Sequence, residues 1–173
     1  MPRDKQTGTS IGQELITLAN DIFDRLVKIK QKYIPYFLVA VTQVDIDWLV
    51  QRLNKLPNFK PSKWMPLDGK YYAVPLNDWK EMAEWDITNY LPYVIDRFDC
   101  DKYALLFKAR MAQFFGVNTV AVVLDYDAGH AYNIVFPIDS DPLIYEPQTD
   151  SFIEIGNRDT RFYKLGENYY IVI

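Results

Sequence analysis

Apolar residues repeat at three- and four-residue spacing near the start of the chain. They include Leu15, Leu18, Ile22, Leu26 and Ile29, and this spacing places them on one face of a helix. We therefore predict a helix over residues 12–32, after a flexible polar lead at residues 1–10. The stripe is expected to pack on the domain or, as the alternative, to form a homo-oligomer; it is too short to indicate a coiled coil.

In the middle of the chain, short apolar runs alternate with longer segments in which apolar residues repeat at helical spacing. The short runs are typical of buried strands. The longer periods begin with acidic residues or a favoured N-cap, as helices do. The elements predicted here are strands over residues 37–42 and 71–75, a helix over residues 45–56, and a second helix from Asn77.

A longer helical pattern and a series of strand-like runs make up the second half. The pattern predicts a buried helix over residues 101–115, with Cys100 at its N-terminus and Gly116 as its end. Helices followed by an antiparallel sheet predict an α+β fold, in a single domain over residues 11–173. The predicted strands of the sheet cover residues 117–124, 131–138, 143–146, 152–155 and 169–173.

Composition excludes several classes of protein. A chain of 173 residues that is 49% apolar can bury one sizeable core. Its longest apolar stretch, residues 34–41, is far shorter than the roughly 20 residues of a membrane span. The polar start lacks the apolar run of a signal peptide. These features predict a soluble protein, cytoplasmic or otherwise without a signal peptide, and no membrane partner.

Negative charge is concentrated in one part of the sequence. Residues 121–160 carry eight carboxylates against the single cation Arg158. Such a surface repels nucleic acid, so we expect no nucleic-acid partner. The carboxylates are equally consistent with a solvated surface and with binding of a hard cation such as calcium.

The chain has one cysteine, Cys100, and one histidine, His130, and both fall at the boundaries of predicted elements. A thiol at a helix N-terminus is stabilised as its thiolate. A histidine at a strand start could reach that thiol, and Glu146, at the end of the next strand, could orient the imidazole ring. Thiol, imidazole and carboxylate in this order predict a nucleophile, a general base and an orienting group.

Each of the three residues also has a purely structural interpretation. Cys100 could be a packed small side chain, His130 a hydrogen-bonded surface residue, and Glu146 a strand end before Pro147. The neighbouring carboxylates Asp99 and Asp101 oppose a thiolate, because nearby negative charge raises the pKa of a thiol. A bound cation would reverse that influence.

Short motifs around these three residues resemble those of a known family. Cys100 between two aspartates, then Gly129-His130-Ala131-Tyr132, then Glu146-Pro147-Gln148 resemble transglutaminase-like and papain-like enzymes in general. The resemblance is closer to the papain-like C-terminal domain of the fairy-ring mushroom (Marasmius oreades) agglutinin, across about residues 85–150. It implies a calcium-dependent cysteine protease fold with Cys100, His130 and Glu146 as the triad.

The same resemblance implies residues around the triad. Lys102 stands where a further carboxylate would strengthen cation binding, so it departs from the family pattern. The backbone N–H of Cys100 is the default oxyanion donor, and Trp85 or Asn89 could assist. The side chains expected near the metal-responsive part of the site are Asp99, Asp101, Asn133 and Gln148.

Three functions remain open at this point. The first is a calcium-responsive cysteine enzyme, either a hydrolase of the peptidase type or an acyl transferase. It would act on a peptide or protein through an acyl-enzyme. The alternative is a non-enzymatic binding or assembly module of the same fold with a relic triad. The third is a metal-binding protein that uses only carboxylates. The sequence does not select the substrate, the acceptor or the oligomeric state.

Overall fold

The computed structural model describes residues 7–33, 40–156 and 161–173. The chain divides into two compact units between residues 35 and 36. The first unit contains the predicted N-terminal helix, α1, which spans Thr7–Tyr33. The four described side chains of its apolar stripe are 50–61% exposed: Leu15, Leu18, Ile22 and Leu26.

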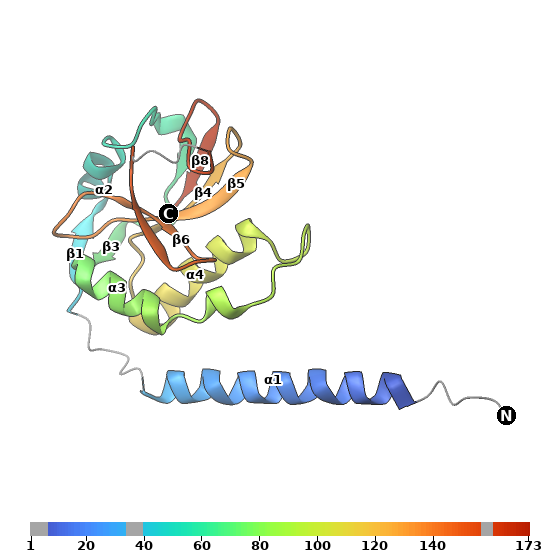
Figure 1. The fold of residues 1–173 in the computed structure, drawn as a ribbon. Coiled ribbons are helices and arrows are strands. Elements are labelled where there is room, and N and C mark those ends of the chain that lie inside the picture. Colours follow the sequence, from blue (N-terminus) through green and yellow to red (C-terminus); the bar gives the residue numbers. More distant parts are fainter. Residues whose placement is uncertain (1–6, 34–39, 157–160) are drawn as a thin grey trace. The chain divides into compact units, whose positions relative to one another are not determined.

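The second unit is built on a six-stranded sheet (Figure 1). The strand order is β2-β8-β4-β5-β6-β7, and every neighbouring pair is antiparallel except the pair of β2 with β8. A separate hairpin pairs β1 with β3. The bounds are β1 Thr42–Asp45, β2 Trp64–Met65, β3 Lys70–Ala73, β4 Val120–Asp125, β5 His130–Val135, β6 Leu143–Glu146, β7 Ser151–Glu154 and β8 Tyr169–Val172.

The large sheet has a hydrophobic core on each face, because side chains alternate along its strands. On one face Ala121 of β4 and Ile134 of β5 join the core that contains helix α2 (Ile46–Leu53). On the other face Val120 and Val135 join the core of helices α3 (Leu76–Trp85) and α4 (Cys100–Phe115). Helix α4 packs directly against β4 and β5 (Figure 1), so the N-terminus of α4 is fixed relative to the sheet.

The α+β expectation with a mainly antiparallel sheet is confirmed, with differences in particular elements. Half of the strand expected at residues 37–42 lies outside the described residues; residues 40 and 41 are not in a strand, and β1 begins at Thr42. Asp45 caps α2, since its carboxylate accepts the N–H of Trp48 at 2.9 Å. Asn77 is not an N-cap: α3 begins at Leu76, whose N–H is bound by the distant Asp139 at 2.9 Å.

Gly116 ends α4 as expected. It has a φ of 64°, in the left-handed region that suits glycine at a helix C-terminus. Within the described residues, no helix is long and apolar enough to cross a membrane.

Candidate functional site

Three elements bring Cys100, His130 and Glu146 together. Cys100 is the first residue of α4, His130 is the first residue of β5, and Glu146 is the last residue of β6. Strands β5 and β6 pair with Asn133 opposite Tyr145. Continuing this register places Glu146 diagonally across from His130 on the same face, within reach of long side chains.

The three side chains follow one another in the order thiol, imidazole, carboxylate. His130 Nε2 lies 2.7 Å from Glu146 Oε2. The thiol of Cys100 is close enough to the imidazole of His130 and to the backbone N–H of Ala131 for both to lower its pKa. This is the order of groups that a nucleophile, base and orienting residue require.

The electrostatics of the pair favour a thiolate beside an imidazolium. The hydrogen bond with His130 lowers the pKa of the Cys100 thiol, although burial acts in the opposite direction. Burial alone would lower the pKa of His130, but its hydrogen bonds with Cys100 and Glu146 outweigh burial and raise the pKa to about 9. The N-terminus of α4 adds partial positive charge at the sulfur.

Glu146 is buried, with a side chain only 6% exposed, and it is held by several donors. Besides His130, the hydroxyl of Tyr163 donates to its Oε2 at 3.1 Å. The backbone N–H of Gln148 donates to its Oε1 at 3.2 Å. Nothing in the sequence marks Tyr163, because it lies in a loop without any periodic pattern.

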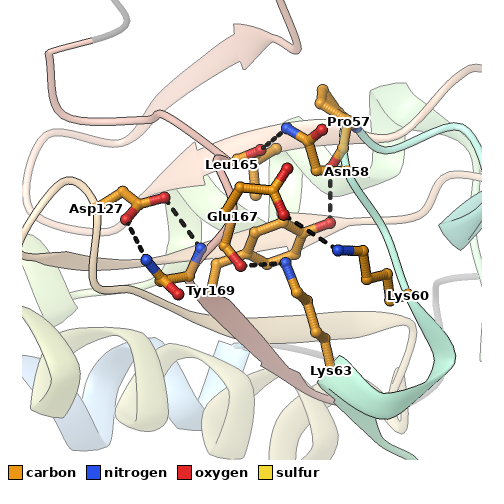
Figure 2. Close-up of polar contacts among 9 residues, drawn as sticks. Pro57, Asn58, Lys60, Lys63, Asp127, Leu165, Glu167 and Tyr169 are labelled. Atoms are coloured by element: carbon orange, nitrogen blue, oxygen red, sulfur yellow. Dashed lines mark hydrogen bonds and ion pairs between the residues drawn. The ribbon is translucent and has the colours of Figure 1, made fainter.

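The loop that carries Tyr163 is anchored at two places. Buried Asp125, at the end of β4, accepts the backbone N–H groups of Lys164 and Leu165, each at 2.9 Å. Farther along, Asp127 Oδ1 accepts the side-chain amide of Asn168 at 2.9 Å. Figure 2 shows the second anchor, where residues of the following segment also meet the loop after α2. Its other contacts join Asn58 to Leu165, Pro57 to Tyr169, and Lys60 and Lys63 to Glu167.

A shallow pocket of about 380 Å³ opens over the thiol and imidazole. Gly129, with a φ of 63°, turns the chain into His130 at its wall. Two exposed aromatic rings line the pocket, Tyr93 at 51% and Phe162 at 45% exposure. The pocket can therefore admit a ligand directly to the sulfur. Its lining residues are Tyr93, Cys100, Ala128, Gly129, His130, Gln148 and Phe162.

The expected metal-responsive residues do not form one ligand set. Lys102 Nζ lies 2.9 Å from Asp99 Oδ1 and 2.9 Å from Asp101 Oδ1, so a cation of the chain itself already neutralises these carboxylates. The pKa of Asp99 is lowered to about 2, first by a hydrogen bond with Asp101 and second by a hydrogen bond with Lys102. Gln148 lines the pocket instead.

Asn133 has a structural position. It is fully buried, and its amide Nδ2 donates to the backbone carbonyls of Ala104 in α4 and Ala121 in β4, both at 3.0 Å. Among the residues that the structure describes, no group of three or more His, Cys, Asp or Glu side chains could hold a metal ion. Calcium responsiveness stays a prediction.

The two side chains expected to assist an oxyanion differ in their placement. Asn89 donates its amide to Asp150 Oδ2 at 2.6 Å, so this donor is engaged elsewhere. Trp85 is the last residue of α3 and is 41% exposed. The backbone N–H of Cys100 lies at the start of α4, where N–H groups lack intrahelical partners.

Comparisons with known proteins relate the chain to the C-terminal domain of a family of lectins. The family model described as the ricin-type beta-trefoil lectin C-terminal domain matches residues 38–163. A solved structure described as "PSL1a-E64 complex" is similar, with 18% identity and a TM-score of 0.58, over 76% of this chain and 50% of that chain. No curated protein matches the chain.

A second similar structure is the lectin of Polyporus squamosus bound to the human-type influenza-binding epitope Neu5Acα2-6Galβ1-4GlcNAc. It is 17% identical with a TM-score of 0.57, over 76% of this chain and 49% of that chain. At these identities the likeness shows the fold. The chain spans about half the length of both proteins.

These findings correct part of the sequence interpretation. The resemblance to a mushroom agglutinin agrees with them, but the papain-like protease assignment does not, because the matching family and structures are lectins. The expectation of a hydrolase or cysteine protease acting on peptides is therefore wrong as a description of the family. The comparisons favour the non-enzymatic binding alternative.

The matched residues cover well over half of the chain and include Cys100, His130 and Glu146. The chain belongs to the family of ricin-type beta-trefoil lectin C-terminal domains.

Proposed function

We propose that Cys100, His130 and Glu146 form a nucleophilic thiol site, which accepts an acyl group as a thioester and transfers it to an amine. One observation carries this proposal: His130 is hydrogen-bonded to the buried carboxylate of Glu146 and lowers the pKa of the Cys100 thiol, and both thiol and imidazole line a pocket. A packed structural cysteine needs neither the imidazole nor the pocket.

Each step assigns one task to a residue of this site. The thiolate of Cys100 attacks a carbonyl carbon, and the tetrahedral oxyanion is stabilised by the N–H groups at the start of α4. The imidazolium of His130 gives its proton to the leaving group as the thioester forms. An amine then attacks the thioester carbonyl and gives a proton to His130, and the C–S bond breaks to form the amide and release the thiolate. Glu146 keeps the ring oriented throughout.

The first test measures the reactivity of Cys100 against pH. Iodoacetamide or E64, a thiol-reactive epoxide, should modify Cys100 with an apparent pKa clearly below 9.0, the ordinary value of the thiol. His130→Ala should return that pKa toward 9.0 or above, because it removes the imidazolium. Tyr170→Ala, an exposed aromatic residue of β8, is the matched control and should behave as the unmodified chain does. A normal titration in the unmodified chain contradicts the proposal.

The second test detects the acyl intermediate itself. Incubation with an activated ester should add one acyl group at Cys100, measured by intact mass spectrometry, and an added amine should remove it. Cys100→Ser should remain unmodified. A reactive thiol that never releases its acyl group to an amine would leave a reactive site but contradict acyl transfer.

The second candidate function is a non-enzymatic binding module, which the family match favours. Here the exposed rings of Tyr93 and Phe162 would stack on a saccharide at the mouth of the pocket. Calorimetry with the sialylated trisaccharide named for the Polyporus lectin tests this candidate. It predicts binding that Tyr93→Ala abolishes and that Cys100→Ser leaves intact.

A further inference from the structure

Within its own unit, helix α1 carries an apolar stripe that no other described residue of that unit covers. Leu15, Leu18, Ile22 and Leu26 are each at least half exposed. An amphipathic helix owes most of its stability to packing of its apolar face. A 27-residue helix that is alone in its unit therefore needs a partner surface for this face.

The separations between the apolar residues of the stripe are the same when α1 is read from either end. In the sequence, apolar or aromatic residues occupy positions 11, 15, 18, 22, 26, 29 and 33. The separations are four, three, four, four, three and four, so the pattern is symmetric about Ile22. The series of four, three and four residues spans 11 residues and occurs twice. An 11-residue repeat keeps a stripe on one face of a nearly straight helix. A symmetric stripe matches a second copy of itself running in the opposite direction.

Charge separates the two halves of the helix in the same way. Residues 7–22 contain Glu14 and Asp21 and no cation, whereas residues 23–33 contain four cations against Asp24. Parallel copies would bring like charges together. Antiparallel copies bring acidic halves to basic halves, and they also align the helix dipoles favourably. The four cations are Arg25, Lys28, Lys30 and Lys32.

We propose that α1 is a self-association surface, on which two copies of this chain pair as antiparallel helices about a twofold axis at Ile22. A twofold interface requires that residue i contacts residue j and that j contacts i. Leu18 of each copy then packs against Leu26 of the other. The acidic half of each copy lies along the basic half of the other, with Glu14 at the level of Lys30 along the axis.

Sedimentation of the full chain at tens of micromolar tests the pairing. We expect a dimer, and Ile22→Lys should weaken it by at least tenfold, because two ammonium groups would meet in an apolar seam. Asn20→Lys makes the same charge change on the opposite face and should leave the dimer intact. A monomeric chain, or equal effects of the two variants, overturns the proposal. If the monomer instead binds anionic phospholipid vesicles through the stripe, the occupant is a membrane surface and the proposal is wrong.

Disulfide trapping tests the direction of pairing. In a Cys100→Ser background, Leu18→Cys mixed with Leu26→Cys should form a crosslinked heterodimer on oxidation, and Leu18→Cys alone should not. In an antiparallel pair the two Leu18 positions are eight residues apart along the axis, or about 12 Å, which exceeds the reach of a disulfide. Efficient crosslinking of Leu18→Cys alone would show parallel pairing and overturn the proposal. These readouts do not depend on the reactivity of Cys100.

Discussion

At the scale of single residues, the site depends on how Glu146 is held. Its carboxylate accepts hydrogen bonds from His130, from Tyr163 and from the backbone of Gln148. Two donors besides the imidazole fix the carboxylate even when the ring moves. Tyr163 is thus a positioning residue that acts on His130 through Glu146.

Replacing Tyr163 with phenylalanine should change the titration of His130. Loss of the hydroxyl leaves more of the carboxylate's charge for the imidazolium, so the pKa of His130 should rise further. A hydrogen bond of about 1 kcal/mol corresponds to a shift of roughly 0.7 units. NMR titration of the single imidazole measures the shift. Tyr126→Phe, at an exposed position, should leave it unchanged, and a fall in the pKa would contradict this role.

The sequence identifies the three central residues but not their support. Cys100, His130 and Glu146 are recognisable because single-copy or charged residues stand at predicted element boundaries. Tyr163 gives no such signal, since its role arises only when its loop folds back over the sheet. Asn133 was expected near a metal, but it lies in a strand whose alternation points it toward α4, where it binds Ala104 and Ala121.

At the scale of elements, the first turn of α4 combines a thiol with two carboxylates and one lysine. Asp99 acts to raise the pKa of the thiol. Lys102 pairs with Asp99 and Asp101 and so offsets part of this charge. The helix N-terminus can then stabilise a thiolate beside two acidic neighbours.

Lys102→Ala should therefore raise the pKa of Cys100, because it leaves both carboxylates without their cation. Rates of iodoacetamide labelling against pH measure the change, and Lys108→Ala, in the same helix, is the comparison. Calcium should partly reverse the effect in the variant and have little influence on the unmodified chain. A calcium effect of equal size in both proteins would contradict a neutralising role for Lys102.

Local sequence also decides which elements could be predicted. The pattern places β6 at residues 143–146, as the structure does, because Pro142 and Pro147 flank that run. The start of α3 could not be predicted, since its first N–H is bound by Asp139, 63 residues away in the sequence. Strand β2 has two residues, and its pairing with β8 becomes visible only in the folded sheet.

At the scale of the whole molecule, the thiol and the imidazole affect stability together. A raised pKa of His130, about 9 instead of 6.5, gives stability that is complete below pH 6.5 and is lost as the pH rises through 9. A lowered pKa of Cys100 gives stability that is complete above pH 9.0 and is lost as the pH falls through the folded value. Where the two pH windows overlap, the two slopes are opposite.

The free energy of unfolding should consequently fall less with rising pH in the unmodified chain than in Cys100→Ser. In the variant the thiol no longer offsets the imidazole, while every other titrating group is the same in both proteins. Urea denaturation at several pH values measures both curves. Equal pH dependence in the two proteins would contradict the paired thiolate and imidazolium.

The two edges of the large sheet differ in what they offer to another chain. At one edge β2 is only two residues long, between Pro61 and Pro66, and prolines cannot donate to a neighbouring strand. At the other edge β7 has four residues and ends at exposed Glu154. Short and charged edges resist the strand-to-strand growth that leads to amyloid-like aggregation. Both edges of the large sheet thus offer few free backbone groups to a strand of another chain.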